Sequence, residues 1–163
     1  MKKEYEDLIK KVFKEAKKYY GENLVSFAIF GSVARGTSSP YSDIDLIIIS
    51  ENLPSGRTKR INEFIENIEI KIEGKIKEMK KKGIFTALSP IIKTPEEVKK
   101  GSFLFLDMIE DSIILYDRDN FFKNYLMELK EKLKKYGAKK IYKKGGYYWI
   151  IKKDFNLKEG IEI

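Results

Sequence analysis

The sequence contains neither cysteine nor histidine. These absences exclude disulfides, thiolate catalysis, zinc-thiolate sites and imidazole as a metal ligand or general base. Any metal bound by this protein must therefore be held by oxygen atoms. Carboxylates, hydroxyls and water suit magnesium, manganese or calcium, so we expect an ion of that kind if a metal is used.

The chain also lacks an uninterrupted apolar run long enough to span a membrane or to form the core of a signal peptide. Its first residues, MKKEYEDLIKKVF, carry acids and lysines at helical spacing instead. We therefore predict a cytoplasmic protein that does not enter the membrane.

The composition predicts one folded domain with an affinity for anions. Its 163 residues suit a single core, and 42% of them are hydrophobic. The formal net charge of +8 favours nucleotides, RNA or an acidic protein surface as partners. The same richness in lysine, glutamate and isoleucine is typical of thermophile proteins, in which many charges only solvate helix faces.

Hydrophobic spacing predicts alternating helices and strands. Apolar residues at helical spacing indicate helices at residues 5–20, 57–82, 95–111 and 121–136. Short apolar runs indicate strands at residues 24–30, 43–49, 84–92 and 112–117. Gly74 and the alternating segment IEIKIE (residues 68–73) indicate where the second helix could break. Pro90 predicts that the third strand lies at an edge or contains a bulge. The order predicts an α/β (α+β) fold with a mixed sheet flanked by helices.

The C-terminal segment differs in composition from the rest. Residues 1–118 are predicted to form the main domain, and residues 119–163 a C-terminal helix and hairpin-like extension packed on it. The hairpin is expected to turn at Gly145-Gly146. Its tyrosines, tryptophan and lysines, including Lys152 and Lys153, suit RNA binding, an aromatic cross-strand hairpin or a contact with a partner protein.

The chemically informative pattern is Gly31-Ser32, ten residues, and then Asp43-Ile44-Asp45 followed by an aliphatic run. Residues two apart on a strand point to the same face, so both carboxylates are predicted to lie side by side. Two close anions are stabilised by a divalent cation. The glycine lets the backbone approach a phosphate closely, so the turn and the acids predict a metal-phosphate site.

The segment GSVARGTSSPYSDIDLIII resembles the signature of the DNA polymerase beta type nucleotidyltransferase superfamily, and in particular its minimal nucleotidyltransferases. The resemblance implies the nucleotidyltransferase fold for residues 1–118 and a nucleoside triphosphate, with ATP favoured, as substrate. It also implies the site residues. Gly31 and Ser32 would hold triphosphate oxygens, Asp43 and Asp45 would be the catalytic ligands of Mg²⁺ or Mn²⁺, and Arg35 and Ser42 would contact phosphate.

One expected group is missing. Active members of this superfamily carry a third carboxylate on the next strand, but the segment IFTALSPII offers only Thr86 and Ser89 as polar side chains. The nearest acids, Glu96 and Glu97, belong to a predicted capping box. Loss of a general base lowers a rate by ~10² to 10⁴, whereas nucleotide binding can survive it. The sequence is thus compatible with a slow enzyme or a binding module without turnover.

Two further groups of residues have local explanations. Tyr41 suits either stacking on a nucleobase or shaping of the turn before the acids, and the turn is favoured. Asp107, Glu110 and Asp111 have the spacing of a solvated helix face, which is favoured over a second metal site.

The resemblance implies transfer of AMP from a triphosphate to a hydroxyl. Relatives of this kind are often encoded beside HEPN-domain RNases and act as antitoxins, so a HEPN-type toxin is the implied protein partner and acceptor. The alternatives are a nucleotide-binding or antitoxin module that lacks catalysis, and an RNA-binding protein on the same fold.

Overall fold

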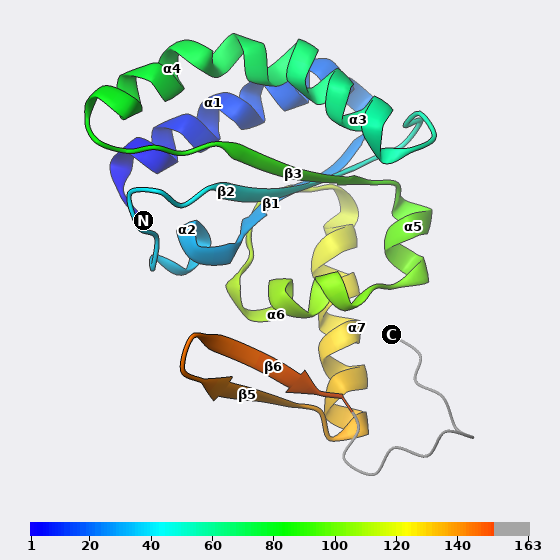
Figure 1. Cartoon of the computed structure of the whole chain (residues 1–163). Helices are drawn as coiled ribbons and strands as arrows, with labels where there is room; N and C mark the ends of the chain where they lie inside the picture. The colour runs from blue at the N-terminus through cyan, green and yellow to red at the C-terminus, as the bar shows by residue number, and fades with distance from the viewer. Residues whose placement is uncertain (152–163) are drawn as a thin grey trace.

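The computed structural model describes residues 1–151, with a four-stranded sheet between two layers of helices and a separate two-stranded hairpin (Figure 1). The sheet contains β1 (Leu24–Phe30), β2 (Ile44–Ser50), β3 (Leu88–Lys93) and β4 (Ile113–Asp117) in the order β3-β2-β1-β4. β1 runs antiparallel to β2 and β4, whereas β2 and β3 are parallel. The mixed sheet predicted from the sequence is confirmed.

The edge position of β3 is confirmed, but the strand begins four residues later than predicted, at Leu88. The segment before it bonds to the loop that precedes β2 and to the first residue of β2. The amide of Phe85 donates to the carbonyl of Pro40 over 2.7 Å, and the amide of Ile44 donates to the carbonyl of Ala87 over 2.9 Å. The apolar pattern of residues 84–92 did not show that the strand begins only at Leu88.

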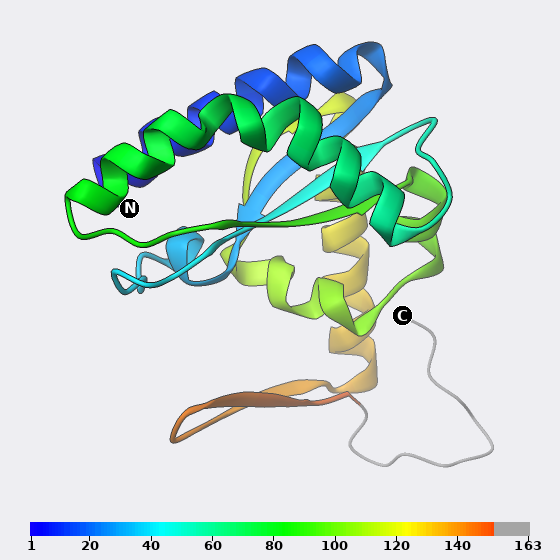
Figure 2. The ribbon, with the colours of Figure 1, turned by 45° about the horizontal axis from the view of Figure 1, so that its top comes forward.

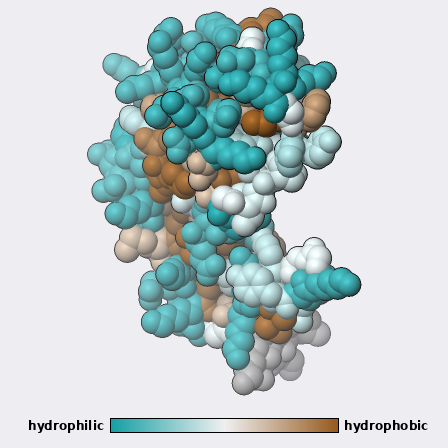
Figure 3. All heavy atoms as spheres, turned by 90° about the vertical axis from the view of Figure 1, so that its left-hand side faces the viewer, coloured by the Kyte–Doolittle hydropathy of each residue, from teal (hydrophilic) through white to brown (hydrophobic). Residues whose placement is uncertain are grey.

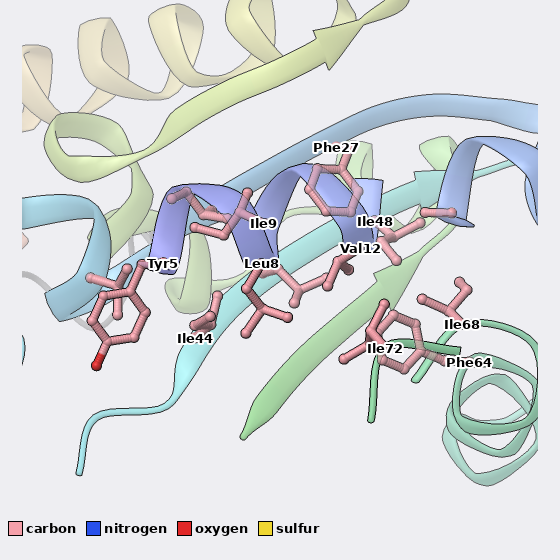
Figure 4. Packing of buried hydrophobic residues seen from close by; sticks show 14 of the residues in the cluster. Tyr5, Leu8, Ile9, Val12, Phe27, Ile44, Ile48, Phe64, Ile68 and Ile72 are labelled. Carbon is pink, nitrogen blue, oxygen red and sulfur yellow. The ribbon is translucent and has the colours of Figure 1, made fainter. Parts of the chain in front are cut away.

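One face of the sheet is covered by α1 (Lys3–Tyr20), α3 (Arg57–Phe64) and α4 (Ile70–Lys81), which Figures 1 and 2 show on the same side. α1 ends before Gly21, as predicted. The break considered at Gly74 and the alternating segment IEIKIE (residues 68–73) is wrong, because the helical backbone continues from α3 into α4 and Gly74 lies inside α4. The helical register changes in a π turn at Ile65–Glu69, which overlaps the start of that segment. Figure 4 shows Leu8 and Val12 of α1 against Ile44 and Ile48 of β2 in the core of this layer.

The other face is covered by α5 (Pro95–Lys100), α6 (Met108–Asp111) and α7 (Phe121–Tyr136). The capping box at the start of α5 is confirmed. The continuous helix predicted for residues 95–111 is wrong, because Gly101 adopts φ 82° and a 3₁₀ turn, Phe103–Asp107, separates α5 from α6. These helices enclose a second apolar cluster with the opposite face of the sheet.

The hairpin contains β5 (Lys139–Lys143) and β6 (Gly146–Ile150), which run antiparallel. It turns at Lys144 and Gly145, one residue earlier than predicted. Lys152 and Lys153, which were grouped with the basic aromatic segment, lie outside the described residues. In residues 1–151 no helix has the length and apolarity that crossing a membrane requires.

Candidate functional site

The predicted site lies where β1 ends and α2 (Gly31–Arg35) begins, beside the start of β2. Phe30 pairs with Asp45 across the sheet, which places the Gly31 backbone next to the Asp45 carboxylate. Gly31 adopts φ 76°, and a Cβ atom added to it would overlap Oδ2 of Asp45 and lie 3.2 Å from Cγ. Glycine is therefore required here both by the backbone conformation and by the close approach.

The two acids differ in their surroundings. β2 begins at Ile44, which is fully buried, so Asp43 is the exposed residue just before the strand and Asp45 is half-buried on it. Burial, and next the charge of Asp43, raise the pKa of Asp45, while Arg35 and Ser89 act in the opposite direction. The positive charge of Arg35 thus does not offset the combined effect of burial and Asp43 on ionised Asp45. A divalent cation would supply further positive charge, so the donor set fits magnesium or manganese.

Arg35, the last residue of α2, connects the acids to α6. Its Nη1 lies 3.4 Å from Oδ2 of Asp111, and its positive charge also lowers the pKa of Asp45. The interpretation of Asp107 and Asp111 as a solvated helix face is wrong for both residues. Asp107 accepts a hydrogen bond from the Tyr147 hydroxyl. These contacts join residues 76 and 40 positions apart, so helical spacing could not predict them.

Ser42 takes part in the loop that leads to the acids. Its Oγ accepts from the Ser39 amide over 2.8 Å, and its carbonyl accepts from the Thr86 hydroxyl over 2.9 Å. Tyr41 stacks on Phe85, with ring centroids 5.5 Å apart and an interplanar angle of 11°. Both residues therefore shape the turn in this structure, and a phosphate contact from Ser42 stays a prediction.

The position beside Asp45 on β3 is occupied by Ser89, which pairs with it in the parallel register. Ser89 also lowers the pKa of Asp45 through a side-chain hydrogen bond. Glu97 cannot serve as the third acid, because both its oxygens bond to Arg60, over 2.7 and 2.8 Å. Throughout residues 1–151, no three acidic side chains gather closely enough to hold a metal.

The surface beside this site is hollowed. A pocket of about 220 Å³ is lined by Arg35 and Asp111 on one side and by the hairpin on the other. A larger pocket, of about 450 Å³, lies around Arg60 and Pro90 and contains neither of the two paired aspartates. Neither Asp43 nor Asp45 lines the smaller pocket, but Arg35, one of the predicted site residues, does.

Comparison with known families agrees with this geometry. The model of the nucleotidyltransferase domain matches residues 9–116, which include the turn and both acids. The chain belongs to this nucleotidyltransferase family. It is 33% identical over 138 residues to the "Putative protein adenylyltransferase MJ1305" of Methanocaldococcus jannaschii, covering 79% of this chain and 83% of that protein. The resemblance recognised in the sequence is thus confirmed, and the protein is a nucleotidyltransferase.

Solved structures share the fold. A crystal structure of a toxin-antitoxin with AMP-PNP aligns with a TM-score of 0.51 and 13% identity, covering 79% of this nucleotidyltransferase and 92% of that chain. A toxin-antitoxin MntA-HpeT mutant aligns with the same TM-score, 12% identity and the same coverage. At these identities the likeness concerns the fold.

Proposed function

We propose that this nucleotidyltransferase transfers AMP from ATP to a hydroxyl group of a partner protein. The observation that carries the proposal is the close approach of the Gly31 backbone to the Asp45 carboxylate, with no side chain between the turn and the acid. A phosphate bound at the turn would lie directly beside the metal ligands. The adenylyltransferase name of the archaeal relative favours adenylate as the transferred group.

Each site residue has a role in this proposal. Gly31 and Ser32 bind triphosphate oxygens through the turn, and Arg35 adds a positive charge on the side of α6. Asp43 and Asp45 would hold Mg²⁺ or Mn²⁺, and the bound ion would supply positive charge next to the phosphates. The acceptor hydroxyl loses its proton to water and its oxygen forms a bond to the α-phosphorus. The bond from that phosphorus to the β-phosphate oxygen breaks, and pyrophosphate leaves with the bonding electrons. The chain contributes chiefly by orienting these groups.

A protein acceptor is favoured over a free metabolite by the comparisons. The archaeal relative is named a protein adenylyltransferase, and the structures of similar fold come from toxin-antitoxin pairs. We propose a HEPN-type toxin as the acceptor and this chain as its antitoxin. The net charge of +8 suits an acidic surface on that partner.

The direct test uses α-labelled nucleoside triphosphates, Mg²⁺ or Mn²⁺, and a purified HEPN-type toxin as the candidate acceptor. Label should pass from ATP to the toxin, and Asp43→Asn and Asp45→Asn should each abolish transfer. Glu96→Gln, an exposed change on α5, is the matched control and should transfer like wild type. Label that reaches the toxin equally well with either aspartate variant would overturn the assignment of the acids.

A second candidate is a nucleotide-binding antitoxin module that has lost turnover. Ser89 favours it, because a neutral hydroxyl stands beside Asp45 where a third acid is expected. Under this alternative, ATP binds with Mg²⁺ and no label reaches the toxin. An RNA-binding role through the hairpin lysines predicts instead an affinity for RNA that falls steeply with salt.

A further inference from the structure

The C-terminal hairpin is fixed to the main body of the molecule. The hydroxyl of Tyr147 donates to Asp107 in the turn before α6, and Nζ of Lys140 lies 3.9 Å from Glu110 of α6. Trp149 packs against the apolar cluster of α7 and the sheet. These contacts come from both strands and reach two different parts of the body, so they hold one face of the hairpin toward α6.

That face carries alternate residues of both strands. Lys140 pairs with Trp149 and Tyr142 pairs with Tyr147 across the hairpin, so all four side chains project from one side. The Lys140 side chain is only 11% exposed, and its Nζ lies 4.1 Å from the Tyr147 ring centroid and 5.4 Å from that of Tyr142. Tyr142, by contrast, is 71% exposed. The Tyr142 ring is thus accessible to a ligand, whereas the Lys140 and Tyr147 side chains already contact the main body.

The exposed Tyr142 ring lines the pocket between the hairpin and α2. Its lining comprises Arg35, Asp111, Lys140, Tyr142, Gly146 and Tyr147. In Figure 3 the surface is hollowed between the main body and the C-terminal part of the molecule. Arg35 lines this pocket, and its positive charge also acts on the Asp45 carboxylate, so this side chain of α2 links the pocket electrostatically to that acid.

We propose that the hairpin completes the nucleotide site and that Tyr142 stacks on the base of the bound nucleoside triphosphate. This inference rests on the proposed function, which places the triphosphate at the turn and the acids. An accessible aromatic ring offers a stacking surface to any base, and the cations of Arg35 and Lys140 suit the charge of a nucleotide. An apolar ligand would be a poor match for a lining that contains three charged groups.

The test measures binding rather than turnover. Calorimetry with Mg²⁺ and a non-hydrolysable ATP analogue is run on wild type, Tyr142→Ala and Tyr142→Phe. Loss of one base-aromatic stack should weaken affinity about 5- to 100-fold in Tyr142→Ala, and the phenylalanine variant should bind like wild type. Tyr148→Ala is the matched control, since Tyr148 is 46% exposed on the opposite face of the hairpin and should leave affinity unchanged.

Two further probes locate the effect. Inorganic tripolyphosphate has no base, so its affinity should be equal in wild type and Tyr142→Ala, and an equal loss for both ligands would overturn stacking. A single-stranded RNA oligonucleotide tests the other source of bases. If Tyr142→Ala weakens only RNA binding, the inference is overturned in favour of an RNA site.

Failure of the inference can be separated from failure of the proposed function. If Asp45→Asn abolishes binding of the ATP analogue while Tyr142→Ala binds like wild type, the hairpin is not part of the site. If Asp45→Asn leaves binding unchanged, the assignment of the acids itself is wrong, and with it the premise of a base placed against Tyr142.

Discussion

Asp45 on β2 and Ser89 on β3 lie side by side in the parallel register of the sheet. The resemblance to the superfamily implies a third acid on this strand, and Ser89 is the polar residue next to Asp45. The serine hydroxyl lowers the pKa of the Asp45 carboxylate but adds no charge of its own. A metal at this site would therefore be held by two carboxylates, with phosphate and water oxygens completing its coordination. A substitution at Ser89 can therefore test whether the negative charge of the metal site limits the rate of nucleotide transfer.

Ser89→Asp should strengthen metal binding and raise the rate of nucleotide transfer, by about tenfold. The new acid should also repel Asp45 when no metal is present, so the metal-free variant should melt below wild type and recover in Mn²⁺. Thermal melts with and without Mn²⁺, together with label transfer, check both effects. Ser89→Asn controls for size without charge, and an equal melting loss in this variant would show that repulsion is not the cause.

Gly31→Ala should abolish binding of the ATP analogue. Its methyl group would overlap the Asp45 carboxylate and displace it from the turn. Gly36→Ala provides the control, because Gly36 has nearly the same φ, 77° against 76°, and no atom within 4 Å of an added Cβ. Both variants should lose about 1 kcal/mol from backbone strain. Only Gly31→Ala should lose binding, as measured by calorimetry, and equal affinities in the two variants would contradict the proposed contact.

Asp45→Asn should stabilise the metal-free protein while it removes function. Burial raises the pKa of Asp45 above 3.8, so the stability associated with its protonated form is present below pH 3.8 and lost as pH rises through the folded pKa. At pH 7 the neutral amide avoids this loss, so we expect the melting temperature of the metal-free protein to rise. Melts at pH 7 without metal check the effect, which should shrink toward pH 3.8. A lower melting temperature at pH 7 would contradict this account.

The parts of the site that could be predicted from the sequence are those encoded locally. Gly31 and Asp45 stand at the end and start of two adjacent apolar strands, and one antiparallel pairing brings them together. Period-two alternation also predicted that Ile44 would point away from the acids, and it is fully buried. Strand pattern and turn chemistry were sufficient here because few residues separate the two strands.

The remaining parts depend on contacts between distant segments. Ser89 reaches Asp45 only through a parallel pairing between two strands that α3 and α4 separate in the sequence. The pairing of Arg35 with Asp111 depends on the ending of α5 at Gly101, which turns the chain before α6. The spacing of hydrophobic residues does not show where the chain turns. From the sequence alone, the acids of α6 therefore had the spacing of a solvent-exposed helix face.

Glu97 and Arg60 form an ion pair that should govern acid stability away from the nucleotide site. Hydrogen bonds from Arg60 are the main cause that lowers the pKa of Glu97 to about 2. Its contribution to stability is therefore complete above the ordinary pKa of 4.5 and is lost as pH falls from there toward about 2. Arg60 is buried and also donates to the carbonyl of Pro54, so it cannot readily turn to solvent when its partner is neutralised.

Glu97→Gln should consequently lower the free energy of unfolding at pH 7 by about 1–3 kcal/mol, because a buried guanidinium loses its charged partner. The loss relative to wild type should shrink as pH approaches 2, where Glu97 itself is protonated. Urea unfolding at several pH values measures this, and Glu96→Gln on the same turn of α5 is the exposed control. If Glu97→Gln destabilises the protein equally at every pH down to 2, the cause is the altered capping box of α5 and not the lost ion pair. The loss of the capping box does not depend on the charge of Glu97.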